Sequence, residues 1–156
     1  MRIRGARPAD AAAACDVLRR SIAELCAADH GGDPAVLAAW LANKTPASLA
    51  AWITHPGNAV LLAVEAGRVI AVGAVNGAGE ITLNYVAPEA RFRGVSRALL
   101  AALEDRARAA GHPRCTLHST QTARRFYAAA GYAETGPAEA SGIPMARPLG
   151  PPMRPP

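Results

Sequence analysis

Three strand-like stretches follow one another in the middle of the chain, with no helical pattern between them. The strands are expected at residues 59–65, 68–75 and 80–87. Each is rich in apolar residues, and the connections Ala66-Gly67 and Asn76-Gly77-Ala78-Gly79 have lengths that suit antiparallel hairpins. Pro88 ends the third strand, because proline cannot continue a β-ladder. The sequence therefore predicts an antiparallel meander at its centre.

Helical patterns and single strands surround this meander. Helices are expected from a cap at Asp10 to residue 29, at 34–42, from a cap at Thr45 to residue 53, at 95–110 and at 122–130, with further strands at 3–6, 114–118, 132–135 and 143–147. In the helix at 95–110, Leu99 and Leu103 are expected to face the core and Glu104 the solvent. A strand–helix–strand unit beside a meander predicts an α+β fold, with a mixed, mostly antiparallel sheet of about six to seven strands flanked by helices.

The length of 156 residues suits one domain, expected over residues 1–147. The proline-rich segment 148–156 is expected to be disordered, because it suits neither helix nor sheet. Neither a signal peptide nor a membrane span is expected, since no apolar run has the required length. The three cysteines form no CxxC pair, which argues against a disulfide framework or a zinc site and favours a cytoplasmic location. No spacing of His, Asp or Glu indicates a metal.

The net charge of +5 indicates an anionic partner, and the arrangement of the arginines narrows its class. Arg91, Arg93 and Arg97 cluster with Gly94 at a predicted helix start. No stretch interleaves arginines with several aromatic residues, as a binder of single-stranded nucleic acid would. We therefore expect a phosphate-bearing small molecule, and neither nucleic acid nor membrane, as the partner.

The segment from Tyr85 to Leu100 carries the chemistry that suits such a ligand. The first turn of a helix has main-chain N–H groups without helical partners and a positive dipole end, so a pyrophosphate would fit there. Gly94 lets an anion approach the backbone, and the small Ser96 adds a hydroxyl donor. The segment lacks the ending of a P-loop and the glycine pattern of a dinucleotide fold. An ordinary surface turn with glycine and arginines is the alternative.

This segment resembles the pyrophosphate loop of the GCN5-related N-acetyltransferases. The loop Arg91-Phe92-Arg93-Gly94-Val95-Ser96 is similar to the family pattern Arg/Gln-x-x-Gly-x-Gly/Ala, and it follows Val86-x-Pro88 at the usual spacing. Phe92 stands where the family commonly has a first glycine, and Ser96, which is also small, stands in place of the last Gly/Ala of the pattern. The resemblance implies a GNAT-like acyl-CoA N-acyltransferase fold and acetyl-CoA as co-substrate. It implies contacts to the cofactor from Tyr85, Val86, Arg91, Phe92, Arg93, Gly94, Val95, Ser96, Arg97, Thr120, Arg124 and Tyr127.

A second stretch, Ala123-x-x-Phe126-Tyr127-x-x-x-Gly131-Tyr132, is similar to a downstream helix of the same family. The resemblance implies that Tyr127 is the general acid that protonates the departing CoA thiolate. Thr120 stands where the family often has asparagine, so the contact of that asparagine to the pantetheine or to an alcohol would be weaker here or would come from Ser119. A pair of core aromatic side chains is the alternative for Phe126 and Tyr127. The resemblance also implies a splayed strand whose main chain, at Tyr85 and Val86, pairs with the pantetheine arm.

Candidates for the remaining roles follow from position. Glu80 lies six residues before Val86 on the same strand face, so it could remove the ammonium proton, often through water; a solvated residue at a hairpin exit is the alternative. Asn84 shares that face and could orient the acceptor. His118 could contact the acceptor or act as the base, and His30 belongs to the front section, where acceptor contacts are expected.

Together these features predict an N-acetyltransferase that transfers an acetyl group from acetyl-CoA to a primary amine of a small molecule or peptide, by direct attack in a ternary complex. A non-catalytic acyl-CoA-binding or regulatory module of the same fold is the alternative. The acceptor, the acyl length and the oligomeric state, including a homodimer, stay open.

Overall fold

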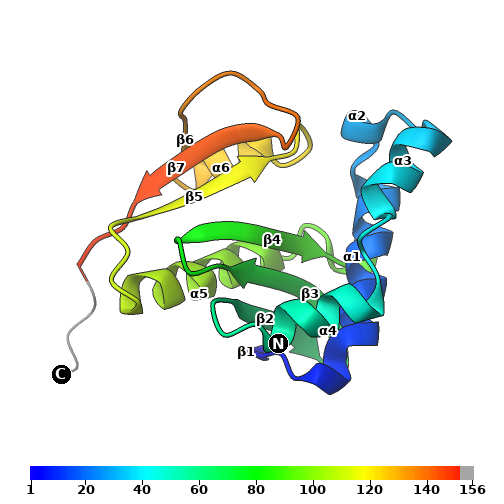
Figure 1. The fold of residues 1–156 in the computed structure, drawn as a ribbon, viewed down its shortest axis with the longest axis horizontal. Helices are drawn as coiled ribbons and strands as arrows, with labels where there is room; N and C mark the ends of the chain where they lie inside the picture. The colour runs from blue at the N-terminus through cyan, green and yellow to red at the C-terminus, as the bar shows by residue number, and fades with distance from the viewer. Residues whose placement is uncertain (152–156) are drawn as a thin grey trace.

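The computed structural model describes residues 1–151, which form one seven-stranded sheet with helices around it (Figure 1). The strands are β1 (Arg2–Gly5), β2 (Ala59–Glu65), β3 (Arg68–Val75), β4 (Glu80–Val86), β5 (Arg114–Ser119), β6 (Ala133–Glu134) and β7 (Ile143–Pro148). Their order in the sheet is β1-β2-β3-β4-β5-β7-β6. Every neighbouring pair is antiparallel except β4 and β5, which are parallel. The predicted mixed, mostly antiparallel sheet is confirmed.

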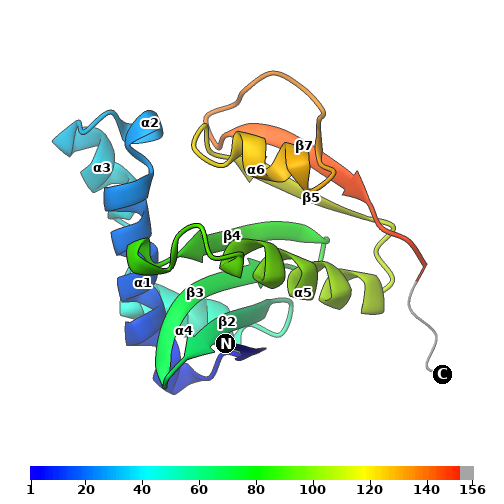
Figure 2. The ribbon, with the colours of Figure 1, turned by 180° about the vertical axis from the view of Figure 1, so that it is seen from behind.

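The helices are α1 (Ala11–Leu25), α2 (Ala27–His30), α3 (Pro34–Leu41), α4 (Pro46–Thr54), α5 (Val95–Ala109) and α6 (Arg124–Ala129), with single 3-10 turns at Pro8–Asp10 and Pro88–Ala90. The helix α5 covers the face of the sheet that is turned to the viewer in Figure 2, and α4 lies on the opposite face, in front in Figure 1. Gly73 of β3 lies directly beneath Leu99 and Leu103 of α5, where a side chain would not fit. The buried core joins these layers around β2 and β3.

The strands β4 and β5 separate soon after they meet. They pair only at Glu80 with Thr116 and Ile81 with Leu117, within the described part of the chain. Beyond this point β4 continues with β3 as its neighbour, whereas β5 continues with β7. The sheet therefore consists of two halves that are joined at one end and open at the other, as Figure 1 shows.

The front helices differ from the sequence prediction in two places. The helix expected to reach residue 29 breaks at Cys26, whose backbone is not helical (φ −102°, ψ 30°), and α2 follows as a separate turn. Asp10 precedes α1, but its carboxylate makes no capping bond to the helix. It instead accepts two hydrogen bonds from Arg4, at 2.8 and 3.0 Å, and so joins β1 to the start of α1. The cap at Thr45 is confirmed, since its hydroxyl accepts the N–H of Ser48 at 3.1 Å.

Glu104 on α5 faces inward, contrary to the prediction, and only 5% of it is exposed. Its carboxylate accepts hydrogen bonds from the Tyr132 hydroxyl at 2.9 Å and from Arg147 at 2.7 Å. Burial of a carboxylate is tolerated here because both partners satisfy it. Glu104 thereby ties α5 to the half of the sheet that contains β7.

The end of the described chain is more ordered than expected at its first residues. The strand β7 includes Pro148, one residue beyond the predicted strand end, and the N–H of Leu149 donates to the Pro113 carbonyl at 2.8 Å. The expected disorder of residues 148–156 therefore does not begin at Pro148, and residues 152–156 lie outside the described chain. Over residues 1–151, no helix combines the length and apolar character needed to cross a membrane.

Candidate functional site

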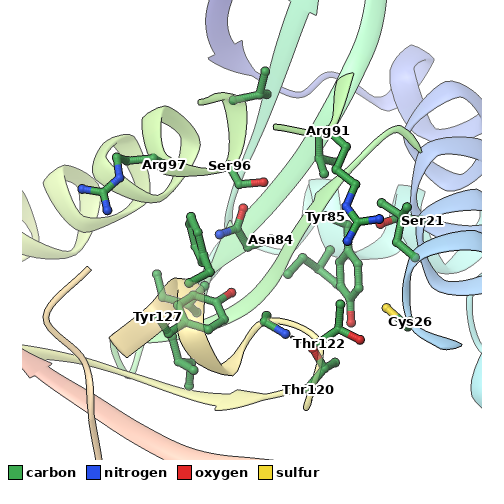
Figure 3. A pocket seen from close by; sticks show the side chains of 18 of the residues that line it. Ser21, Cys26, Asn84, Tyr85, Arg91, Ser96, Arg97, Thr120, Thr122 and Tyr127 are labelled. Atoms are coloured by element: carbon green, nitrogen blue, oxygen red, sulfur yellow. Dashed lines mark hydrogen bonds between the residues drawn. The ribbon is translucent and has the colours of Figure 1, made fainter. Parts of the chain in front are cut away.

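A pocket of about 490 Å³ lies where β4 and β5 diverge (Figure 3). Its walls come from β4, from the loop and first turn of α5, from β5 and α6, and from the end of α1. Many of the residues selected from the sequence line it, although they come from four separate elements. They are Asn84, Tyr85, Val86, Arg91, Phe92, Gly94, Val95, Ser96, Arg97, His118, Thr120 and Tyr127.

Four selected residues do not line this pocket, and each has another partner. Arg93 forms an ion pair with Glu65 at 2.6 Å, and Arg124 forms one with Glu134 at 2.7 Å. His30 is buried: its Nδ1 accepts the N–H of Gly32 at 3.0 Å, and its Nε2 lies 3.1 Å from the Ile22 carbonyl. His30 therefore closes the turn after α1, and the phosphate contacts expected from Arg93 and Arg124 would require these ion pairs to break.

Glu80, the fourth of these residues, does not line the pocket but lies next to His118, which does. Its Oε2 lies 3.5 Å from Nδ1 of His118, and its Oε1 accepts a hydrogen bond from Asn76 at 3.2 Å. His118 itself lines the pocket, and its Nε2 lies 3.2 Å from a carboxylate oxygen of Glu139. Any effect of Glu80 on a bound molecule would therefore act through His118.

The loop before α5 has a left-handed backbone at Phe92 as well as at Gly94. Gly94 caps α5 in the left-handed region (φ 78°), and Phe92 has a φ of 64°. A left-handed backbone costs a residue with a side chain roughly 1 kcal/mol or more. The Phe92 side chain is 88% exposed, and the Arg91 guanidinium lies 4.4 Å from the centre of its ring. The first helical bond runs from the Ala98 N–H to Gly94, so the preceding N–H groups can bind an anion.

Tyr127 and Asn84 face each other across the middle of the pocket (Figure 3). Tyr127 is only 7% exposed, and burial raises the pKa of its hydroxyl to about 12. Edge-to-face contacts with Phe126 and Tyr132, at ring distances of 5.1 and 5.6 Å, hold its ring. Both polar atoms of the Asn84 amide are buried without a hydrogen-bond partner among the described residues. Asn84 opposes part of the rise in the pKa of Tyr127, so the two side chains lie close enough to interact, and the unpaired amide can bind a polar ligand group.

One end of the pocket contains residues that sequence reasoning did not place there. Ser21 and Cys26 come from the end of α1, and Thr122 comes from the turn before α6. Burial, with the nearby Asp29 charge, raises the pKa of the Cys26 thiol to about 11. Ser21 gave one signal, since it is a polar residue on the inward face of an amphipathic helix. Cys26 belongs to the front section where acceptor contacts are expected, and a helix break brings it here. Thr122 gave no signal, because a contact distant in sequence places it beside Asp29.

The remaining selected residues have local structural roles. The Thr120 hydroxyl accepts the N–H of Ala123 at 3.1 Å, so it also caps the turn before α6. Ser119 is 1% exposed and does not line the pocket, and its hydroxyl donates to the Thr120 carbonyl at 2.7 Å. Cys115 is fully buried, as expected of a small core residue. Within residues 1–151, no group of three or more His, Cys, Asp or Glu side chains is arranged to hold a metal ion.

Comparisons with known proteins agree with this geometry. A GCN5-related N-acetyltransferase from Rhodopseudomonas palustris is 27% identical, with a TM-score of 0.83 and 95% of each chain covered. The PaiA N-acetyltransferase from Thermoplasma acidophilum, solved with coenzyme A, is 18% identical, with a TM-score of 0.80 and coverage of 95% of this chain and 98% of that one. YncA from Salmonella typhimurium, solved with acetyl-CoA, is 22% identical, with a TM-score of 0.72 and coverage of 99% and 97%. The sequence matches no curated protein.

A family model described as an acetyltransferase (GNAT) domain matches residues 26–147, which include β2 to β7, the loop before α5 and Tyr127. The match thus spans the whole pocket except Ser21 and Leu25. This match covers most of the chain, and it includes the diverging strands and the loop before α5. The chain therefore belongs to the GNAT acetyltransferase family.

Proposed function

We propose that this protein transfers an acetyl group from acetyl-CoA to a primary amine of a small molecule or peptide, by direct attack while both substrates are bound. The observation that carries the proposal is the pocket between β4 and β5, which holds an anion-binding helix start, an open strand edge and a buried tyrosine together. Two of the similar structures contain coenzyme A or acetyl-CoA, which supports this choice of donor.

The residues present fit acetyl-CoA. Its pyrophosphate would meet the N–H groups at the start of α5, together with Ser96 and Arg97 on the same side of the pocket (Figure 3). Its pantetheine arm has amide groups that can pair with the edge of β4 that β5 leaves open, at Tyr85 and Val86. The unsatisfied Asn84 amide lies between these two regions and can bind a carbonyl or amide of the same arm.

Acetyl transfer needs a neutral amine, correct orientation and a stabilised carbonyl oxygen. The amine nitrogen forms a bond to the acetyl carbon, the carbon–sulfur bond breaks, and the sulfur takes the proton of the Tyr127 hydroxyl. Because its pKa is about 12, Tyr127 carries this proton at every ordinary working pH. The nitrogen releases one proton to a base as the amide forms, and the Tyr127 tyrosinate takes one proton from the solvent, which restores the enzyme.

We propose that His118 accepts the proton of the amine and that Glu80 holds the ring of His118. His118 lines the pocket, and the described lining residues contain no carboxylate that could act instead. Glu80 lies 3.5 Å from Nδ1 and holds the ring, whereas the exposed Glu139 lies 3.2 Å from Nε2 and has to turn away before this nitrogen takes the proton of the amine. Glu80 thus keeps a place in the mechanism, as a positioning residue instead of the base that contacts the amine.

The test is the release of free thiol from acetyl-CoA in the presence of amino acids, peptides, polyamines and simple amines. Tyr127→Phe should lower kcat by about 10²-fold or more while the Kd for CoA stays within a few-fold, since only the proton donor is lost. Tyr132→Phe is the matched control: its hydroxyl contacts Glu104, so this variant should lose stability and keep kcat. Tight acetyl-CoA binding without thiol release from any amine would favour the alternative, a non-catalytic acyl-CoA-binding module.

A further inference from the structure

The pocket contains cations but no acidic side chain. None of the described lining residues is Asp or Glu, whereas Arg91 and Arg97 both line the pocket. Glu24 and Glu89 adjoin lining residues in the sequence, but both form ion pairs with Arg20 on α1. A polycationic acceptor would therefore find no carboxylate among the lining residues. Glu80 and Glu139 lie behind the lining, where both contact the ring of His118.

Asp29, the acid nearest to Cys26, is also occupied. Its carboxylate accepts hydrogen bonds from the N–H groups of Gln121 and Thr122, at 2.6 and 3.2 Å, and from the Thr122 hydroxyl at 2.6 Å. With these three donors Asp29 joins α2 to the start of α6. Its charge is therefore satisfied by the protein and is not offered to an acceptor amine.

The two arginines of the pocket point to different ends. Arg97 lies beside Ser96, whereas Arg91 points toward Ser21 and Tyr85, on the side where Cys26 and α1 close the pocket (Figure 3). Arg91 makes no ion pair or hydrogen bond through its guanidinium within residues 1–151; the aromatic ring of Phe92 is its recorded contact, at 4.4 Å. The family resemblance implies that Arg91 contacts the phosphates of the cofactor. The direction of its side chain instead favours the end of the pocket near Ser21 and Cys26.

Phe92 explains how Arg91 keeps this direction. The backbone of Phe92 is strained, and its ring is too exposed to contribute to the core. The ring instead holds the guanidinium by a cation–π contact, at 4.4 Å from the ring centre. A residue that costs stability in a loop where glycine would fit is best explained by such a role.

We propose that the acceptor of this transferase is a primary amine that also carries a carboxylate, and that Arg91 binds this carboxylate with the Ser21 hydroxyl beside it. This inference rests on the proposed function and narrows its substrate class. A guanidinium matches a carboxylate with two parallel hydrogen bonds, so it orients the acceptor as well as attracting it. The same cation disfavours polyamines.

The experiment compares matched acceptors with the wild-type protein. Each amino acid of a panel is paired with its carboxamide and with the amine that lacks the carboxyl group, and carboxyl-amidated dipeptides that begin with Asp or Glu separate side-chain carboxylates from α-carboxylates. The expected kcat/KM is at least about tenfold higher for the carboxylate than for its amide, as a charged hydrogen bond implies. A preference for amides or polyamines, with normal thiol release, would overturn the inference and leave the proposed function intact. Thiol release from no amine at all would reject both.

Two variants assign the effect to Arg91. Arg91→Gln should reduce the carboxylate-to-amide ratio of kcat/KM toward one, and Arg106→Gln, on the exposed surface of α5 outside the pocket, should keep the wild-type ratio. Phe92→Gly relieves the strained backbone, so it should fold with an equal or higher Tm and still lower the ratio. An increased KM for acetyl-CoA in Arg91→Gln with an unchanged acceptor ratio would return Arg91 to the phosphates and overturn the inference.

Discussion

The carboxylate of Asp29 accepts a hydrogen bond from the hydroxyl of Thr122 at 2.6 Å and so joins α2 to the turn before α6. Asp29 lies in α2, after the end of α1, whereas Thr122 lies between β5 and α6 and lines the pocket. This contact therefore connects the front helices to the part of the pocket wall that follows β5.

Asp29→Ala should loosen this connection. Three hydrogen bonds are lost, and each contributes about 1 kcal/mol at most because the site is exposed. The free energy of unfolding should therefore fall by about 1–2 kcal/mol. Hydrogen exchange at the amides of Gln121 and Thr122 should accelerate more than exchange in β2 or β3. Asp33→Ala, which removes a cap at α3, is a control of similar cost. Equal acceleration in both variants would show that Asp29 does not hold the turn.

Glu104→Ala should be one of the more destabilising single substitutions in α5. It removes the acceptor of the Tyr132 hydroxyl and of Arg147, and it leaves a hole at a site that is 5% exposed. We expect a loss of about 2–4 kcal/mol in the free energy of unfolding, measured with urea. Asp105→Ala, one residue further on the exposed face, should cost less than about 1 kcal/mol. Similar losses in the two variants would contradict the importance of this buried network.

Glu104 also shows where the sequence stops being informative. The strands, the hairpins and α5 were predictable because glycine, proline and apolar periodicity act over a few residues. The direction of Glu104 depends on Arg147, 43 residues away, and a charged residue without a visible partner is naturally assigned to solvent. The site divides in the same way. The loop at residues 91–97 is one continuous segment and could be found, whereas Ser21, Cys26 and Thr122 meet only through the fold.

The ion pair between Arg4 and Asp10 should make stability fall in acid. The hydrogen bonds from Arg4 hold the pKa of Asp10 well below its usual value of 3.8. The unfolded chain therefore binds a proton at higher pH than the folded protein, so the stabilisation is complete above about pH 5 and is lost as the pH falls through 3.8 and below. Asp10→Asn should cost about 2 kcal/mol at pH 7 and progressively less below pH 4. A cost that stays constant down to pH 2 would assign the effect to packing.

Gly94→Glu should abolish acetyl-CoA binding with little loss of folded protein. A side chain at this position meets no atom within 4 Å, so the substitution places a negative charge at the helix start without a clash. Gly111→Glu is the matched control, because its backbone is also left-handed (φ 87°) and its surroundings are equally open, at the far end of α5. Calorimetric titration with CoA should show binding by the Gly111 variant alone. Wild-type affinity in a folded Gly94→Glu protein would reject the loop as the phosphate site.

Direct transfer predicts that no acetyl group becomes attached to Cys26, the one thiol that lines the pocket among the described residues. Its pKa of about 11 leaves almost no thiolate at neutral pH, and only the thiolate is an effective nucleophile. Labelling of Cys26 by N-ethylmaleimide should therefore be slow at pH 7.5 and should accelerate as the pH rises toward 11. Intact-mass measurement after incubation with acetyl-CoA alone should show an unmodified chain. Rapid labelling at neutral pH would contradict the raised pKa of Cys26, and an added acetyl group that disappears in Cys26→Ser would contradict direct transfer.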